Sequence, residues 1–340
     1  MASFEPLISV ILPNYNHAGC IQQALDGILR QKYQKWEVLV ADDASTDGSR
    51  EVIEANVQKD FRIRAFFSER NRGVCENLNH ALPESSGEYV FCAAADDFIS
   101  DPDFFSDAVE GFSTWREAGV FSGIARMVSA ESNEELYFCG ETPEEGFLPG
   151  REAMRSFVAN TFFLHGACTI VRTEWLKQMG FAEGLGPLAD LLVFQSAAAN
   201  HGAIFRRKVY LCVTKAERNF SKGTTVIQHH LFEKRLRELV PDSGEFEKEF
   251  EAWRFKKIIF LISSAIQMRS AEGAVAVTEM LSEVMCFYPP LVPKLPSKEA
   301  LLALTTHLRE NVRHPGLRAG IPDLVKIIDA VIRPFYQSEV

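Results

Sequence analysis

The stretch EYVFCAAADD, residues 88–97, decides how this chain folds. After its first residue it is apolar as far as Ala95, which predicts a buried strand, and Asp96 and Asp97 stand where that strand ends. Adjacent carboxylates repel each other, and partial burial adds a desolvation cost. Two interpretations stay open: a divalent cation compensates both charges, or the acids belong to a solvated turn before a helix that starts near residues 100–102.

Short apolar runs alternate with helical patterns on the N-terminal side of this stretch. We predict strands at residues 7–12, 36–41, 63–67 and 89–94, and helices at 20–31, 49–59 and 74–82. Strands and helices in this order form right-handed crossovers, so the expected fold is α/β, with a mostly parallel sheet and helices on both faces.

Every predicted strand ends in polar residues. The four ends are PNYN at 13–16, DDASTDG at 42–48, SERNRG at 68–73, and the acidic pair. In parallel sheets ligands bind beside the carboxyl ends of the strands. We therefore expect one site that all four segments share.

The second half of the chain changes character. Mixed patterns predict strands at 120–128, 136–139, 167–171 and 203–210, and helices at 150–160, 173–179 and 188–200. After about residue 225 only amphipathic helices follow, at 226–240, 246–268, 271–287, 298–312 and 322–335. We predict a catalytic domain at 1–224 and a helical accessory region at 225–340, which offers a surface for a homodimer.

Composition limits the class of protein. The chain has 340 residues, 46% hydrophobic, and a net charge of −10 without a long basic run, which argues against nucleic acid as a partner. The seven cysteines form no CxxC pair and the start resembles no signal peptide, so we expect free thiols in a cytoplasmic protein. Residues 253–262, WRFKKIIFLI, predict either peripheral membrane contact or a core helix with a basic edge.

The ordered motifs resemble the family 2 glycosyltransferases, whose catalytic domain has the Rossmann-like GT-A fold. The resemblance covers residues 7–210 and rests on SVILPNYN at 9–16, VADDASTDGS at 40–49, Asn71, Gly73 and Asn79 before SGEYV at 86–90, and GFAE at 180–183 with Asp190. It implies an inverting, hexosyltransferase-type enzyme of surface polysaccharide biosynthesis. Such an enzyme moves a sugar from a nucleotide-sugar donor, here expected to be a UDP-sugar, to a hydroxyl of a glycan or lipid-linked acceptor.

Donor binding is expected at the first two strand ends. Tyr15 offers a flat ring to a pyrimidine and Asp43 offers an acceptor for a ring N–H, with the Pro13 backbone nearby. The alternatives are a half-buried ring at the sheet edge and turn chemistry between Asp43 and Ser45. Arg70 and Arg72 are candidates for positive charge on the diphosphate side, with surface arginines beside a turn as the alternative.

The resemblance gives the acidic pair a metal role. Asp97 is the expected ligand of Mg²⁺ or Mn²⁺, and Asp96 the expected contact of the ribose or of the metal's coordination shell. Most family members carry a further Asp where this chain has Ala94. Metal dependence therefore stays open.

Asp190 matches the position of the family's general base, which removes the proton of the acceptor hydroxyl. Ala189 precedes it where another acid is usual, and on sequence alone a helix cap is the alternative. His165 is a candidate for the acceptor side and His17 for phosphate, each with a structural alternative. Arg218 and Lys222 match a basic segment that covers the diphosphate in the family.

Two rival functions remain. Ala94 and Ala189 motivate a catalytically weak or inactive GT-A domain that binds nucleotide or glycan. A nucleotidyltransferase ranks lower, because the first loop lacks the basic, glycine-rich character that a triphosphate requires.

Overall fold

The computed structural model describes residues 4–132, 134–140, 144–159, 164–215, 224–251, 253–254 and 257. The chain divides into two compact units, one containing residues 1–223 and 232–249, the other 224–231 and 250–340. The helices predicted at 271–287, 298–312 and 322–335, and most of the one at 246–268, lie outside the described residues, as does most of the basic segment at 253–262. The domain boundary at residue 224 stays a prediction.

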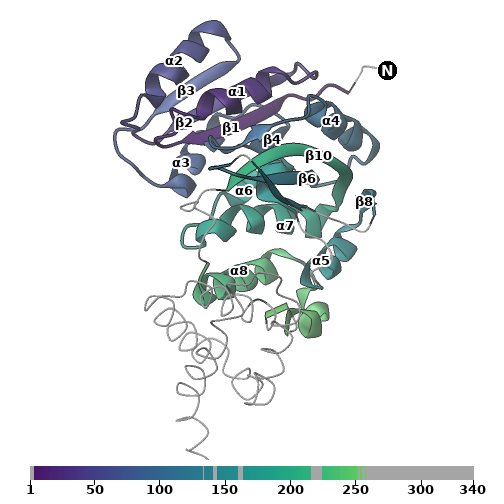
Figure 1. The fold of residues 1–340 in the computed structure, drawn as a ribbon. Helices are drawn as coiled ribbons and strands as arrows, with labels where there is room; N and C mark the ends of the chain where they lie inside the picture. Colours follow the sequence, from purple (N-terminus) through teal and green to yellow (C-terminus); the bar gives the residue numbers. More distant parts are fainter. Residues whose placement is uncertain are drawn as a thin grey trace, which may run out of the picture. The chain divides into compact units, whose positions relative to one another are not determined.

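One mixed sheet forms the centre of the first unit (Figure 1). Its strands are β1 (Ile8–Asn14), β2 (Trp36–Asp42), β3 (Ile63–Phe67), β4 (Tyr89–Cys92), β5 (Phe98–Ile99), β6 (Val120–Ser129), β7 (Glu135–Cys139), β8 (Gly146–Leu148), β9 (Thr169–Arg172) and β10 (Ala203–Lys215). The order is β3-β2-β1-β4-β9-β6-β10-β5, with β7 paired to β6 and β8 to β10. β3, β2, β1 and β4 are parallel, β9 is antiparallel to both β4 and β6, and β10 is parallel to β6.

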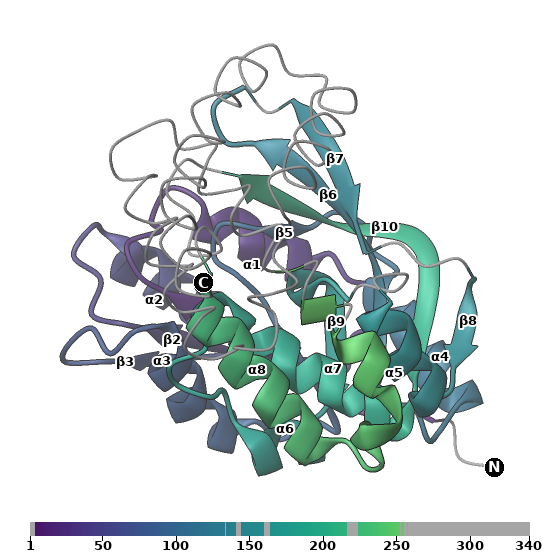
Figure 2. The same cartoon turned by 90° about the horizontal axis from the view of Figure 1, so that it is seen from below.

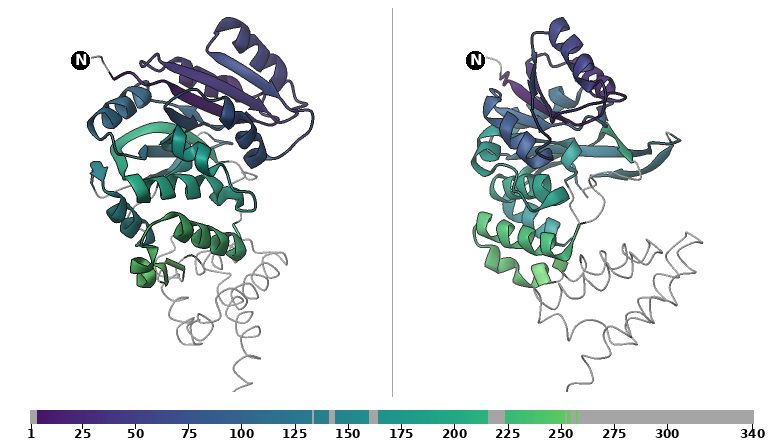
Figure 3. Two further views of the ribbon diagram at one scale, coloured as in Figure 1. Left: turned by 180° about the vertical axis from the view of Figure 1, so that it is seen from behind. Right: turned by 90° about the vertical axis from the view of Figure 1, so that its left-hand side faces the viewer.

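Helices cover both faces of this sheet, as predicted. They are α1 (Ile21–Leu29), α2 (Ser49–Lys59), α3 (Val74–Ala81), α4 (Phe104–Thr114), α5 (Gly150–Val158), α6 (Thr173–Met179) and α7 (Ala189–His201). Residues of α1, α2 and α4 share one apolar cluster with the sheet, and residues of α3, α5, α6 and α7 share a second cluster. Figure 3 shows the parallel strands, drawn in purple to blue, and α7, drawn in teal. A further helix, α8 (Val226–Leu239), belongs partly to each compact unit.

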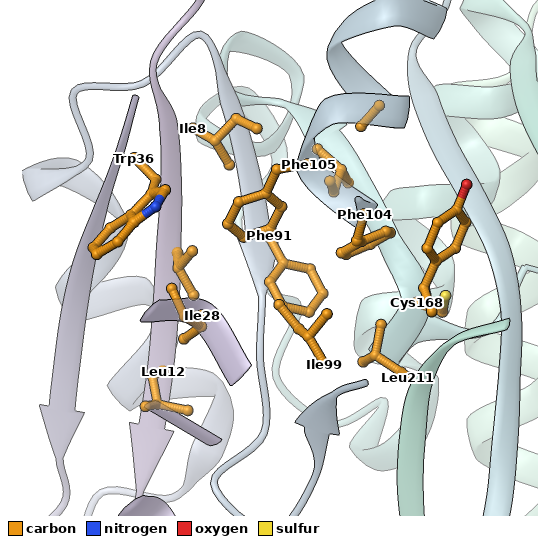
Figure 4. Close-up of a cluster of buried hydrophobic side chains, with 14 of the residues drawn as sticks. Ile8, Leu12, Ile28, Trp36, Phe91, Ile99, Phe104, Phe105, Cys168 and Leu211 are labelled. Carbon is orange, nitrogen blue, oxygen red and sulfur yellow. The ribbon is translucent and has the colours of Figure 1, made fainter. Parts of the chain in front are cut away.

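Aromatic side chains fill the core beneath α1 and α4. Phe91 of β4 meets Phe104 and Phe105 of α4 edge-on, with ring centroids 5.3 and 6.1 Å apart (Figure 4). Trp36 is buried at the start of β2 and contributes to the same cluster. Burial of these large apolar side chains is the main favourable contribution to the free energy that holds the helices on the sheet.

The structure differs from the predicted elements mainly around β9. The predicted strand at 167–171 begins with a 3₁₀ turn, Gly166–Cys168, and only then becomes β9. β10 continues to Lys215 rather than ending at residue 210, because its far end pairs with β6 and β5. The short strands β5 and β8 were not predicted, and α4 begins at Phe104, just after the helix start that the sequence indicates near residues 100–102.

Candidate active site

The strand directions bring many segments to one edge of the sheet, here called the carboxyl edge. β1, β2, β3 and β4 run parallel and all end there. β9 is antiparallel to β4 and therefore begins at this edge, while β6 and β10 run against β9 and end there. Loops from both halves of the chain thus meet at a single edge.

Asp42 connects the first two loops of this edge. Its carboxylate accepts hydrogen bonds from the Asn14 side chain at 2.7 Å and from the Ser45 hydroxyl at 2.6 Å. Asn16 is in the left-handed region with φ 57°, and its backbone N–H donates to the Ser45 hydroxyl. Between them, the Tyr15 side chain is 44% exposed. This network holds the first loop against the second and leaves the Tyr15 ring available for stacking.

Asp43 connects the second loop to the third. It is buried, and its two carboxylate oxygens accept the backbone N–H groups of Arg72 at 2.9 Å and Gly73 at 2.8 Å. Each oxygen has a second lone pair, so the carboxylate retains capacity for two more donors. Pro13, on β1, is in register with Ala41, two residues before Asp43. The structure therefore brings Pro13, Asp43 and the backbone of Arg72 close together.

The acidic pair follows β4, as predicted. Asp97 is 9% exposed, and one of its oxygens accepts the backbone N–H of Thr214 at 2.8 Å. Burial, together with the charge of Asp96, raises the pKa of Asp97 to about 8, although Thr214 and Lys215 oppose this rise. Burial also raises the pKa of Cys20, which directly precedes α1, and the charges of Asp96, Asp47 and Asp97 add to this rise.

This arrangement fits a divalent cation. A buried carboxylate next to a second acid lacks compensation, and the described residues provide no hydrogen bond to the other oxygen of Asp97. No group of three His, Cys, Asp or Glu side chains converges among the described residues. A cation held by Asp97 and Asp96 would therefore need phosphate oxygens and water as its remaining ligands, which Mg²⁺ commonly takes.

Asp190 lies in the first turn of α7, at the same edge. Burial raises its pKa to about 6, while the backbone N–H of Leu191 donates to it at 2.6 Å and opposes the rise. A Cβ atom built on Gly166 would lie 1.9 Å from the Asp190 carboxylate, so only glycine leaves room for it. The charge of Asp190 also adds to the rise in the pKa of Cys92 at the end of β4.

Two contacts fix the backbone at Phe181, nine residues before Asp190. The Asn79 amide donates to the Phe181 carbonyl at 2.8 Å and accepts the Phe181 N–H at 2.7 Å. His165 comes directly before the glycine that Asp190 approaches, and burial lowers its pKa to about 4, followed by the charge of Lys215. His165 is therefore neutral at pH 7 and lies near Lys215 at the carboxyl edge.

The remaining candidate residues differ in how far they are exposed. Arg70 is exposed, Arg72 is half-buried, and Arg218 and Lys222 lie outside the described residues. His17 donates its backbone N–H to the Ser49 hydroxyl. Sequence reasoning missed the Thr214 N–H and the space left by Gly166, because both depend on strand pairing rather than on local pattern.

A mixed sheet with an acidic pair after β4 and a half-buried carboxylate at the start of α7 fits a GT-A type of transferase. The model for "Glycosyl transferase family 2" matches residues 9–180, and the chain belongs to this family. The poly-beta-1,6-N-acetyl-D-glucosamine synthase of Staphylococcus epidermidis is 30% identical over 177 residues, which cover 51% of this chain and 41% of that protein. The chain spans about two fifths of the length of the curated relatives it matches.

Two solved structures share the fold. S. aureus TarS 1-349 in complex with UDP-GlcNAc has a TM-score of 0.65 at 18% identity and covers 98% of this chain and 92% of that one. The Pyrobaculum calidifontis mannosyltransferase PcManGT, in complex with GDP-Man and Mn²⁺, has a TM-score of 0.57 at 20% identity and covers 99% and 89%. At these identities the likeness shows the fold alone, which confirms the predicted GT-A architecture.

Proposed function

We propose that this family 2 glycosyltransferase moves a sugar from a UDP-sugar to a hydroxyl of a glycan or lipid-linked acceptor, with inversion at the anomeric carbon. One observation carries the proposal: the half-buried Asp190 carboxylate lies at the same edge of the sheet as the Asp96–Asp97 pair. Names of relatives support surface polysaccharide assembly as the setting, and the UDP-GlcNAc complex of TarS supports a uridine donor.

Asp190 would act as the general base. A pKa of about 6 leaves this carboxylate ionised at pH 7 to 8 and makes it a stronger base than an ordinary aspartate. It takes the proton of the acceptor hydroxyl while that oxygen attacks the anomeric carbon opposite the departing diphosphate. A single displacement of this kind inverts the configuration.

The first three loops would hold the donor. The exposed Tyr15 ring stacks on the uracil, and a free lone pair of Asp43 accepts the ring N–H next to the Pro13 backbone. Asp96 contacts the ribose, and Arg72 contributes positive charge near the diphosphate. The same Asp43 carboxylate accepts the backbone N–H of Arg72, so it holds both the donor and the third loop.

Asp97, together with Asp96, would hold Mg²⁺ or Mn²⁺. Such an ion neutralises the charge that develops on the leaving diphosphate. The chain's own contribution is the Thr214 N–H, which orients Asp97 so that its other oxygen is available.

Thermal-shift measurements with UDP and UMP, with and without Mn²⁺, test the donor site. We expect a stabilisation by UDP that requires the metal and is lost in Asp97→Ala, while Asp103→Ala, a surface acid paired with Lys32, behaves as wild type. A metal-independent shift that survives in Asp97→Ala contradicts the assigned metal role.

Release of UDP from UDP-GlcNAc separates an enzyme from an inactive binding module. The absence of the acids that Ala94 and Ala189 replace favours the inactive alternative. An enzyme releases UDP slowly by hydrolysis, and this release should stop in Asp97→Ala. A protein that binds UDP but releases none is a binding module.

The remaining expectations belong to the same proposal. They are the catalytic domain at 1–224, the accessory region at 225–340, a homodimer, and a cytoplasmic protein in peripheral contact with the membrane. Among the described residues no helix is long and apolar enough to cross a bilayer.

A further inference from the structure

A row of side chains crosses four strands beside the acidic pair. Phe98 of β5, which follows Asp97, is in register with Cys212 of β10, and Cys212 is in register with Arg126 of β6. Arg126 is in turn in register with Phe138 of β7. Figure 2 shows β6, β7 and β10 side by side in this part of the sheet. Residues in register point to the same face of a sheet, so the row forms one surface.

This surface faces the side of the sheet where α7 carries Asp190. Val120 and Ile124 of β6 pack in the apolar cluster that contains Phe194 of α7. Side chains alternate along a strand, so Arg126 points to the same side as Ile124, one step closer to the carboxyl edge. Arg126 therefore lies beyond the segment of β6 that α7 covers, on the side of the proposed base.

The Arg126 guanidinium has no acidic partner among the described residues. It is half-buried and donates one hydrogen bond to the Cys212 sulfur at 2.9 Å, while its buried Nε has no partner. The acid whose charge acts on it is Glu135, an exposed residue of β7 that makes no ion pair with it. A thiol contact does not neutralise a guanidinium, and half-buried cations are usually paired.

An exposed aromatic ring lies next to this cation. Phe138 is 42% exposed and shares the face of Arg126. Tyr137, 50% exposed, is in register with Met127 and therefore points to the opposite face of the same strand. A cation beside an apolar ring suits an anion that carries an apolar chain better than it suits a free inorganic anion.

We propose that Arg126 and Phe138 form a subsite for the phosphate and the first apolar atoms of a lipid-linked acceptor. Guanidinium groups bind phosphate through paired, charge-assisted hydrogen bonds, and the Phe138 ring packs against the chain that follows. Strands are spaced about 4.8 Å apart, so Arg126 lies about 10 Å from the strand of Phe98, on the acceptor side of the acidic pair. This inference rests on the proposed function and names its acceptor class.

Binding of decyl phosphate to the full chain, measured by calorimetry with UDP and Mn²⁺ present, tests the subsite. We expect Arg126→Gln to weaken binding at least about tenfold, because it removes charge-assisted hydrogen bonds, and Arg126→Lys to retain part of it. Phe138→Ser should weaken the binding of decyl phosphate about fivefold and leave the binding of inorganic phosphate unchanged. Tyr137→Ser, on the opposite face of β7, is the matched control and should bind as wild type.

Several results would overturn the subsite. They are a wild-type protein that does not bind decyl phosphate, equal binding by wild type and Arg126→Gln, or an equal loss in Tyr137→Ser. If Arg126→Gln instead weakens UDP but not UMP, Arg126 binds the donor diphosphate and the acceptor assignment fails. The metal-dependent UDP shift of the same samples reports separately on the proposed function, so each idea fails on its own measurement.

Discussion

Replacing Asp190 by asparagine should stabilise the protein while it stops sugar transfer. Burial raises the pKa of this carboxyl from 3.8 to about 6. Each pH unit between the unfolded and folded values corresponds to about 1.4 kcal/mol, so the ionised carboxylate costs about 3 kcal/mol at neutral pH. Asparagine keeps an oxygen for the Leu191 N–H but adds an amide that needs partners, so we expect a gain of about 2 kcal/mol.

The pH dependence of this gain follows from the sign of the pKa change. A raised folded-state pKa favours the protonated form, so the folded state has its full stability below about pH 4 and loses it as pH rises towards 6. The difference between Asp190→Asn and wild type is therefore fully present at pH 7.5 and falls to about a third at pH 5, because the cost of the added amide does not change with pH. Transfer by the wild type should decrease below about pH 6, as the base becomes protonated.

Melting curves at pH 7.5 and 5, with transfer assays on the same samples, measure both effects. A gain of about 2 kcal/mol corresponds to roughly 3 °C in melting temperature for a chain of 340 residues. Glu54→Gln, an exposed acid of α2 paired only with Arg50, is the control and should shift neither quantity appreciably. A gain of the same size at both pH values would refute the burial argument, and unchanged transfer would remove Asp190 from the chemistry.

Three further substitutions test residues that hold parts of the proposed site in position. Gly166→Ala places a methyl group on the Asp190 carboxylate, so transfer should fall about 100-fold while UDP binding, followed by calorimetry, stays unchanged. Asn79→Ala breaks both hydrogen bonds to Phe181 and should lower kcat with little change in the donor KM, at a cost of about 1–3 kcal/mol in denaturant unfolding; an equal change in KM would contradict a positioning role. Asp43→Ala frees two backbone N–H groups of the third loop, so UDP affinity should fall about tenfold, and unaltered affinity would exclude Asp43 from the donor site.

The N-terminal half of the fold was accessible from sequence because its pattern is local. Each parallel strand there is a short apolar run that ends in polar residues, and α2 begins and ends at the predicted residues, Ser49–Lys59. The same regularity located the acidic pair, since buried strands do not end in two carboxylates without a reason. The two-residue β5 carries no such local signal, and the run at 167–171 predicts a strand but not its antiparallel place between β4 and β6, because both places depend on partners far away in the chain.

The same limit of prediction from sequence applies to single residues of the site. Asp97 and Asp190 follow recognisable segments, so the sequence could propose them. Arg126 could not be proposed, because its lack of an acidic partner in the part of the chain that the structure describes, and its alignment with Phe98, follow from the register of β10 with both β6 and β5. Gly166 belongs to the same group, since its need for glycine arises from a carboxylate 24 positions later in the chain.

Helix α3 contacts both the residue that we assign to the donor and the segment that precedes the proposed base. At its start, the Gly73 N–H donates to Asp43, which we assign to the donor. Near its end, Asn79 binds both backbone groups of Phe181, nine residues before the proposed base. Between these points, Asn77 donates to the Ala41 carbonyl at 2.7 Å and fixes the helix to β2. One short helix therefore carries all three attachments, so the loop that we assign to the donor and the segment that precedes Asp190 are held by the same element.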